Sequence, residues 1–341
     1  MRKLTQNNLT RRRFLSGATS VGAASILGLP GKSYAEPPPE TSTIRLMRLP
    51  AICAAPQYVA EELLRIEGFT NIQYVELEGT KSPGAYNIAR GAVDISMWDL
   101  PALIPLLDAQ EPVVILAGIH AGCFELFGND SVSSIKDLKG KAIAVSVLGG
   151  SEHIFLSSMM AYVGMNPRQD VRWVTGTSVR DSMTLFVQGK ADAFLGFAPQ
   201  PQELRSKKIG HVILNTAQDR PWSQYFCCVL AAHRDFVRKY PIATKRAIRA
   251  ILKGADICAT EPERAAQHLV AKGWEPRYNI ALEVLQELPY RRWREANPED
   301  TLRFHALRLH EVGMIKTTPN ELVRRSTDWR FLNELKKELK A

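Results

Sequence analysis

The chain has 341 residues, of which 44 are basic and 35 acidic, so its formal net charge is +9. Six of the basic residues and none of the acidic ones precede Glu36, and the remaining 306 residues carry a net charge of only +3. So small a charge removes most of the support for a nucleic-acid-binding protein. The length exceeds one ordinary core and predicts two lobes, and five cysteines are too few for a disulfide scaffold.

The first 35 residues have the order of a cleaved export signal. A basic stretch precedes an apolar one at 17–29, and small residues follow as far as Ala35, after which we expect cleavage. The twin-arginine route, which exports folded proteins, is indicated by four residues: Arg11, Arg12, Phe14 and Leu15. The apolar stretch is shorter than the ~20 residues that span a bilayer. No cysteine precedes Cys53, so we expect a periplasmic protein without a lipid anchor.

The rest of the chain alternates short apolar runs with helical patterns, which predicts two lobes built on parallel α/β sheets. In the first unit we expect strands at 44–47, 72–75, 92–97 and 113–117, and a helix at 57–66. In the second unit we expect strands at 142–146, 171–174 and 191–195, and helices at 151–163 and 179–188.

From Phe236 onward the pattern is mostly helical, and Pro241 is well placed in a first helical turn. We expect these helices to pack back onto the first lobe. The charged face of the helix that begins at Pro241 is predicted to be solvated, and it consists of Lys245, Arg246, Arg249 and Lys253.

Four strings of residues resemble one known family. Residues 87–96 resemble an A-x-G-x-V-D signature, residues 135–141 an I-x-D-L-K-G-K turn, and residues 188–193 an x-G-x-x-D-A repeat of the first theme. Residues 234–241 resemble an R-D-F…P entry to C-terminal helices. Together they resemble the NMT1-like family of periplasmic sulfonate-, nitrate- and thiamine-precursor-binding proteins, in the right order over nearly all of residues 43–275.

This resemblance implies a type II periplasmic-binding-protein fold with a ligand clamped between two α/β lobes. The division it implies is a signal peptide at 1–35, the first part of lobe 1 at 36–130, lobe 2 at 131–222, and a return to lobe 1 with C-terminal helices at 223–341. The expected function is the substrate-binding component of an ABC importer for a small anionic or zwitterionic solute, such as a sulfonate, nitrate or a pyrimidine. Its expected partners are the permease subunits and, during export, the twin-arginine translocase.

Two alternatives remain beside transport. A sensory binding protein would present the same closed lobes to a membrane receptor. An enzyme resembling thiamine-pyrimidine synthase is disfavoured, because the cysteine-rich run of that relative is reduced here to 226–228 and no nucleophile elbow, P-loop or dinucleotide fingerprint is present. We therefore expect no catalytic residue, cofactor or metal, and no nucleic-acid partner.

Ligands of open parallel α/β sheets lie at the carboxyl ends of the strands. The most informative such segment is Gly149, Gly150, Ser151 and Glu152, where Ser151 is predicted to cap a helix whose N-terminus attracts an anion. Glu152 partly opposes an anion, and the segment also reads as a plain turn and cap. The same rule selects further candidate ligand contacts: Ala51, Ile52, Trp98, Asp99, His120, Cys123 and Phe197. Trp222 is a candidate gate beside the hinge, Trp98 and Trp222 could equally be core residues, and Asp99 also reads as a helix cap.

The cysteines leave several possibilities open. His120 and Cys123 form a His-x-x-Cys pair that could converge on zinc with the distant His153, but a second short pair that would support a metal site is missing. Cys53 and Cys123 lie on expected cleft loops and could be bridged. Cys227 and Cys228 are adjacent in a strand, which predicts buried side chains that face opposite ways. Oligomeric state is not indicated.

Overall fold

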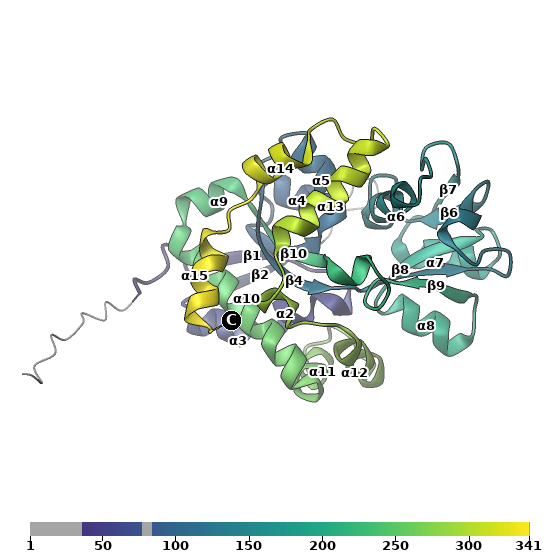
Figure 1. The fold of residues 1–341 in the computed structure, drawn as a ribbon. Coiled ribbons are helices and arrows are strands. Elements are labelled where there is room, and N and C mark those ends of the chain that lie inside the picture. Colours follow the sequence, from purple (N-terminus) through teal and green to yellow (C-terminus); the bar gives the residue numbers. More distant parts are fainter. Residues whose placement is uncertain (1–35, 77–83, 341) are drawn as a thin grey trace, which may run out of the picture. The chain divides into compact units, whose positions relative to one another are not determined.

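The computed structural model describes residues 36–76 and 84–340 (Figure 1). The export signal predicted for residues 1–35 lies outside these residues. Residues from Pro38 onward form one compact unit. Within the described residues, no helix has the length and apolar character needed to cross a membrane.

The first lobe contains two small sheets. β1 (Thr43–Met47) pairs in parallel with β2 (Asn71–Val75). The return strand β10 (Phe226–His233) lies between β3 (Ile95–Asp99) and β4 (Val113–Ala121) and is antiparallel to both. Four helices and a 3₁₀ turn belong to this part of the chain: η1 (Ile52–Ala54), α2 (Ala55–Val59), α3 (Glu61–Ile66), α4 (Tyr86–Ala89) and α5 (Leu100–Asp108).

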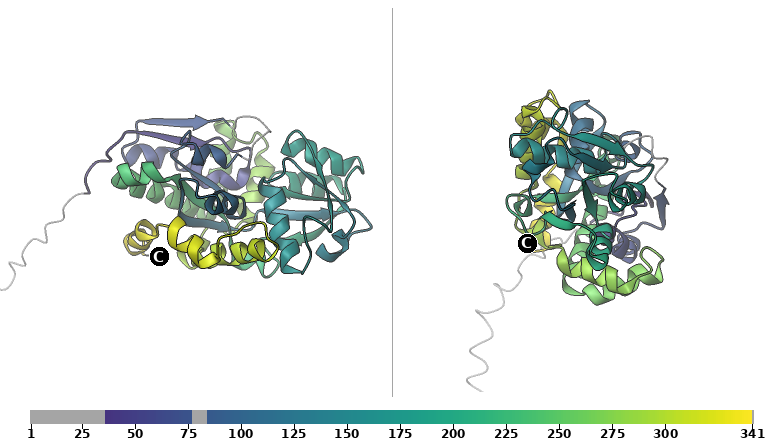
Figure 2. Two further views of the ribbon diagram at one scale, coloured as in Figure 1. Left: turned by 90° about the horizontal axis from the view of Figure 1, so that it is seen from above. Right: turned by 90° about the vertical axis from the view of Figure 1, so that its right-hand side faces the viewer.

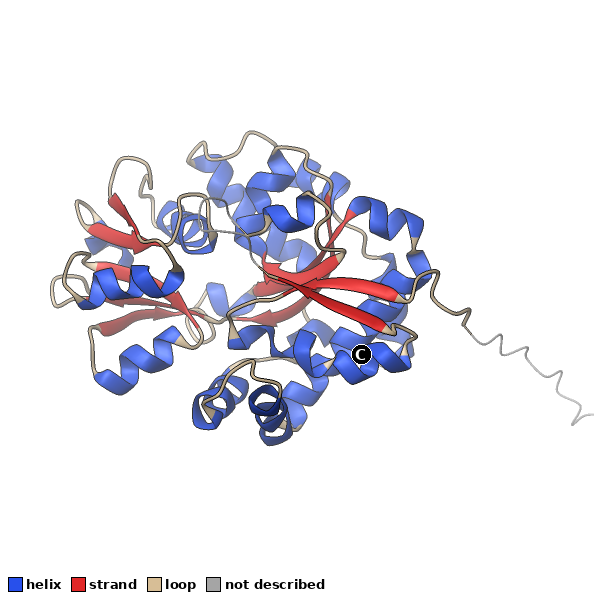
Figure 3. Ribbon diagram, turned by 180° about the vertical axis from the view of Figure 1, so that it is seen from behind, coloured by secondary structure: helices blue, strands red, loops and turns tan. Residues whose placement is uncertain are grey.

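The second lobe is built on one five-stranded sheet in the order β7-β6-β8-β5-β9. The strands are β5 (Phe124–Gly128), β6 (Ala142–Val145), β7 (Arg172–Thr175), β8 (Ala193–Phe197) and β9 (His211–Asn215). The other elements are η2 (Ile135–Leu138), α6 (Ser151–Tyr162), α7 (Val179–Val187), α8 (Gln200–Lys207) and η3 (Trp222–Gln224). The chain passes between the two lobes twice, from β4 to β5 and from β9 to β10, and Figure 3 shows the strands of each lobe flanked by helices.

The C-terminal part is helical and packs mainly on the first lobe. It comprises α9 (Arg234–Lys239), α10 (Pro241–Thr260), α11 (Pro262–Ala271), α12 (Tyr278–Glu287), η4 (Arg292–Arg294), α13 (Pro298–Glu311), α14 (Pro319–Ser326) and α15 (Arg330–Glu338). Helices α14 and α15 contact β4, as predicted, whereas α13 contacts both α5 and the second-lobe helix α6 (Figure 2). Helix α10 lies so close to α2 that a Cβ at Gly254 would be 2.3 Å from the carbonyl oxygen of Pro56.

The aspartates of the two repeated sequence motifs have the same structural role in the two lobes. Asp94 accepts a hydrogen bond from the backbone N–H of Arg45 at 2.7 Å, beside β1. Asp192 accepts one from the backbone N–H of Ala142 at 2.8 Å, beside β6. Each carboxylate thus binds the backbone of the neighbouring strand. This structural role explains why the motif repeats, and no ligand contact is needed to explain it.

Most expected elements are confirmed, with three differences. The helix expected at 57–66 is divided at Ala60 into α2 and α3. The sheets are mixed and not wholly parallel, because β5 and β10 run against their neighbours. Strand β5 pairs within the second sheet although the predicted boundary at residue 130 assigns it to the first lobe; the domain boundaries as a whole stay a prediction.

The charged face of α10 is not the solvated surface that the sequence predicted. Arg249 binds Glu67 at 2.5 Å and Glu338 at 3.2 Å, and Lys245 binds Glu334 at 3.1 Å. The basic side chains therefore connect α10 to the end of α3 and to α15, two elements far apart in the sequence.

Candidate functional site

A direct hydrogen bond joins the two lobes where β3 ends and α6 begins. The Asp99 carboxylate accepts a hydrogen bond from the backbone N–H of Ala102 at 3.1 Å, which confirms it as the cap of α5. Its other oxygen accepts a hydrogen bond from the hydroxyl of Ser151 in the second lobe. Two of the predicted ligand residues are therefore brought together across the lobe junction.

The prediction that Ser151 caps α6 is wrong, because its hydroxyl is engaged by Asp99. Gly150 occupies the cap position and no side chain caps the helix. The preceding turn is held instead by the backbone N–H of Gly149, which donates to Nδ1 of His153 at 3.0 Å. Burial lowers the pKa of His153 to about 4, so this ring is neutral near pH 7 and can accept the bond.

Two buried acids lie at this junction. Burial raises the pKa of Asp99 to about 7, and the hydrogen bond from Ser151 only partly offsets that effect. Burial also raises the pKa of Glu152, of which Oε2 accepts a hydrogen bond from Ser146 at 3.0 Å while Oε1 has no partner. A protonated Glu152 opposes an anion at the start of α6 less than the ionised residue would.

Another of the predicted contacts, Ile52, also lies where the two lobes meet. The backbone N–H of Ile52, next to Ala51, donates to the carbonyl of Ala198 at 3.2 Å, and the neighbouring Phe197 ring packs edge-on against Phe124. Trp98 is half-buried and its indole N–H has no partner.

Trp222 lies apart from Ser151. It packs on Tyr162, with ring centroids 5.5 Å apart, at the end of α6 opposite Ser151. The rise of a helix puts that end about 16 Å from Ser151. Nothing in this position brings Trp222 to the other candidates.

A cluster of sulfur and imidazole groups adjoins the junction. The side-chain ligand atoms of Cys53, His120, Cys123 and Cys228 all lie within 4.8 Å of one another, and all four residues are buried. All five cysteines are free thiols. The bridge considered between Cys53 and Cys123 is therefore not formed, and the sulfur of Cys123 lies 2.9 Å from that of Cys227.

Cys227 and Cys228 do not face opposite ways as a regular strand would require. Their sulfur atoms are 4.0 Å apart, and the pairing of β10 with β4 shifts register on both sides of Cys228. A β-bulge re-aims side chains in this manner. The bulge therefore turns both thiols toward Cys123, and the prediction that both are buried is confirmed.

The thiols and the imidazole influence one another strongly. Hydrogen bonds from Cys123, Cys227 and Cys53 lower the pKa of Cys228 well below its usual range. Burial lowers the pKa of His120, but the neighbouring Cys228 thiolate outweighs it and the net shift is upward.

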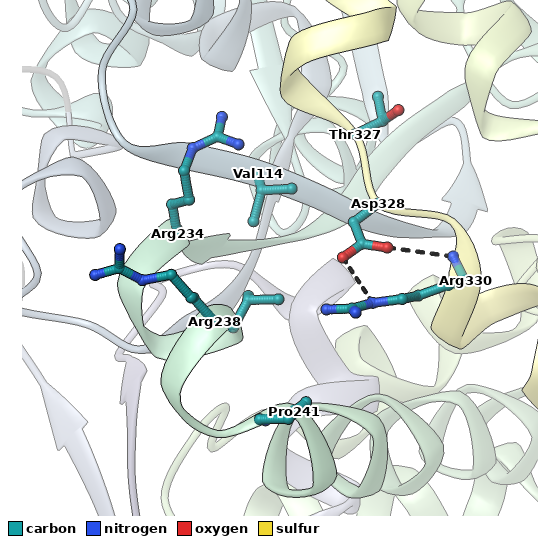
Figure 4. Close-up of a pocket in the computed structure, with 8 residues that line it drawn as sticks. Val114, Arg234, Arg238, Pro241, Thr327, Asp328 and Arg330 are labelled. Carbon is teal, nitrogen blue, oxygen red and sulfur yellow. Dashed lines mark hydrogen bonds and ion pairs between the residues drawn. The ribbon is translucent and has the colours of Figure 1, made fainter.

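A separate pocket of about 330 Å³ opens elsewhere on the first lobe, beside β4, α9 and α15 (Figure 4). Arg330 is paired with Asp328 there at 3.0 Å. The pocket is lined by Val114, Arg234, Val237, Arg238, Pro241, Thr327, Asp328 and Arg330. None of these residues is a ligand contact predicted from the sequence.

Comparison with known proteins places the fold. Residues 67–265 match the family model described as NMT1/THI5 like. The nitrate-binding protein NrtA from Synechocystis is 16% identical, with a TM-score of 0.71, and the match covers 89% of this chain and 90% of that one. The alkanesulfonate-binding protein SsuA from Xanthomonas axonopodis pv. citri, bound to MOPS, is 15% identical, with a TM-score of 0.68 and coverage of 86% and 99%.

A third similar structure is a mutant of DszB in complex with biphenyl-2-sulfinic acid, which is 15% identical, with a TM-score of 0.56 and coverage of 87% and 99%. No curated protein matches the sequence. At these identities the structural matches show the two-lobed periplasmic-binding-protein fold.

Proposed function

Because the chain belongs to the NMT1/THI5-like family, we propose that it is the substrate-binding component of an ABC importer and not an enzyme. The observation that carries the proposal is the hydrogen bond between Asp99 and Ser151, which places polar groups of both lobes at one junction. This junction lies at the carboxyl ends of the strands, where open α/β sheets bind ligands.

The proposed mechanism is closure about a hinge. Within the described residues, two passages of the chain connect the sheets. The lobes also contact each other through the backbone hydrogen bond from Ile52 to Ala198 and through side chains, such as Arg205 of α8 with Glu283 and Glu287 of α12. A ligand that binds both lobes stabilises the closed state and shifts the population toward it. The closed face then docks on the permease and releases the ligand there.

The proposed ligand is a small anion or zwitterion. The N-terminus of α6 carries no side-chain cap, and helix N-termini attract negative groups. Burial favours the neutral form of Glu152 in the first turn. Nitrate and alkanesulfonates, which the similar structures are named for binding, are the first compounds to test.

The proposal includes export by the twin-arginine route, with cleavage after Ala35. Replacing the pair Arg11 and Arg12 by lysines should leave the precursor inside the cell, and the exported protein should begin at Glu36 when its N-terminus is sequenced. Export of the lysine variant at the normal rate would contradict this route.

The site itself is tested by calorimetric titration of the wild type and of Ser151→Ala and Trp98→Ala. Loss of a hydrogen bond or of an aromatic contact at the ligand should weaken binding about tenfold or more, measured at a temperature at which every variant is folded. Ser131→Ala, an exposed serine on the second lobe, is the matched control and should bind normally. Normal binding by both site variants would place the ligand elsewhere.

A further inference from the structure

Four side chains from three distant parts of the chain converge on one buried point. Cys53 comes from η1, His120 from the end of β4, Cys123 from the passage into the second lobe, and Cys228 from the start of β10. Their ligand atoms lie within 4.8 Å of one another. Around a tetrahedral Zn²⁺ with Zn–S bonds of about 2.3 Å, sulfur atoms lie about 3.8 Å apart, so shifts of about 1 Å or less would complete the site.

The imidazole of His120 is already oriented as a metal ligand requires. Its Nδ1 lies 3.1 Å from the carbonyl oxygen of Gly122 and 3.3 Å from that of Ala121, so Nδ1 carries the proton and donates it to the backbone. The other nitrogen, Nε2, is buried without a hydrogen-bond partner. A backbone carbonyl that fixes the tautomer in this way is the usual outer-sphere partner of a metal-bound histidine.

The backbone that presents Cys123 is strained. Gly122 has a φ of 67°, and a Cβ there would lie 2.4 Å from Cα of Ala217, so only glycine fits. Cys123 itself has a φ of 137°, a conformation that residues with a side chain rarely adopt. Strain of this kind persists where the surroundings hold a residue in a functional position, and here it directs the thiol into the cluster.

We propose that Cys53, His120, Cys123 and Cys228 form a tetrahedral site for a thiophilic divalent cation, with Zn²⁺ as the fitting ion. Three sulfurs and one nitrogen make a complete set of four ligands, which is typical of structural zinc sites and leaves no open position for catalysis. The fifth group, Cys227, lies 2.9 Å from Cys123 but outside the set of four.

The position of the site gives the metal a structural role. Cys123 lies on the first passage between the lobes, and Cys228 lies where the second passage enters β10. Cys53 lies in η1, whose Ile52 contacts the second lobe through Ala198. A bound ion would therefore join both passages to the ligand-facing loop of the first lobe and restrict movement of the hinge.

The competing state is a disulfide between Cys123 and Cys227. A sulfur separation of 2.9 Å makes that bond accessible to oxidation by molecular oxygen, which takes up the two electrons and two protons that the thiols release. Its formation would remove one metal ligand. The two states are mutually exclusive, so the test must control oxidation. Cys227→Ser removes the competing bond and leaves all four proposed ligands in place.

The experiment uses the full chain, reduced and freed of metal, and titrates it with Zn²⁺ and with Co²⁺ as a spectroscopic probe. We expect one ion per chain by elemental analysis. With Co²⁺ we expect the thiolate charge-transfer band and the intense visible bands of tetrahedral coordination. The Cys227→Ser variant should behave in the same way and should retain the ion after exposure to air.

Two further variants separate ligation from folding. Cys228→Ser and His120→Gln should each bind Zn²⁺ more weakly than the wild type. The loss should exceed the about 10–100-fold that is typical when an outer-sphere partner of a ligand is replaced. Cys258→Ser is the matched control, because this buried thiol of α10 lies outside the cluster, and it should retain the ion. In the folded wild type, Zn²⁺ should also slow thiol alkylation of Cys53, Cys123 and Cys228, and a chelator should reverse this.

The proposal is overturned if the reduced Cys227→Ser chain is folded by circular dichroism and takes up no Co²⁺ in tetrahedral form. It is also overturned if Zn²⁺ binds without protecting these thiols, since the ion is then adventitious and lies elsewhere. A wild-type chain that still binds no metal after its Cys123–Cys227 disulfide has been reduced would contradict it as well.

Discussion

Asp99 is a buried carboxyl that ends β3 and accepts a hydrogen bond from Ser151 of the other lobe. Burial raises its pKa to about 7 from an ordinary value of 3.8. In the pH interval between these values the folded chain holds a proton on Asp99 that the unfolded chain has released. The stability that this proton provides is complete below about pH 4 and is lost as the pH rises toward 7.

Asp99→Asn should therefore flatten the dependence of stability on pH. Asparagine stays neutral; its side-chain oxygen can accept the hydrogen bond from the N–H of Ala102, and its amide N–H can donate to the hydroxyl of Ser151. Between pH 4 and pH 8 the wild type should lose stability relative to the variant by an amount on the order of a few kcal/mol. Urea unfolding of both proteins in a metal chelator measures this difference. A difference that is constant across the interval would show that Asp99 is ionised throughout.

At the scale of single residues, the sequence identified residues of the site more reliably than it identified which residues contact one another. Ser151 and Asp99 both follow from the position of strand ends and helix starts, but their mutual bond depends on how two lobes meet. Cys227 and Cys228 were assigned opposite directions because a regular strand alternates, and the bulge in β10 reverses this. His120 and Cys123 formed one short pair, while the other two donors of the cluster come from distant elements.

At the scale of elements, apolar runs predicted the buried strands and missed the polar or interrupted ones. The core strand β4 and the helix α10 follow directly from their apolar positions. Helix α8 was missed because its eight residues are mostly polar and carry no apolar stripe. Strand β5 was missed because Glu125 interrupts it, and that charge is only compensated by a helix far along the chain.

Helix α8 is held to the first lobe by charge. Arg205 contacts Glu125 of β5, and its guanidinium also binds Glu283 at 2.8 Å and Glu287 at 2.6 Å. Glu125 is buried, and burial raises its pKa although Arg205 opposes this. The guanidinium thus pairs with three carboxylates at a contact between the lobes.

Arg205→Ala should destabilise the protein by about 1–3 kcal/mol, because it leaves the buried Glu125 without its charged partner. The same change should favour separation of the lobes and increase the radius of gyration without ligand. Urea unfolding and small-angle scattering measure the two effects. Arg238→Ala is the control, since its exposed pair with Asp235 should contribute close to nothing. If the two variants behave equally, the ion pairs of α8 do not hold the lobes together.

At the scale of the whole molecule, two sheet-containing lobes are connected by two passages, and the C-terminal helices pack chiefly on the first. This arrangement was predictable, because the restart of the strand–helix pattern and four ordered motifs indicated it. The ligand was not predictable, because a few side chains at the junction decide it and the fold leaves them free to vary. The proposed function therefore has to be tested by measuring which ligand binds.

The most direct test is a thermal-shift screen of residues 36–341 against nitrate, sulfonates, carboxylates and pyrimidines. A ligand present at about 100 times its dissociation constant should stabilise the folded state by about 2.7 kcal/mol and raise the melting temperature visibly. We expect a clear rise of the melting temperature with one chemical class, and a smaller rise with the same class in Ser151→Ala. Well-folded protein that responds to no compound in the panel, and that carries no ligand from expression, would contradict it.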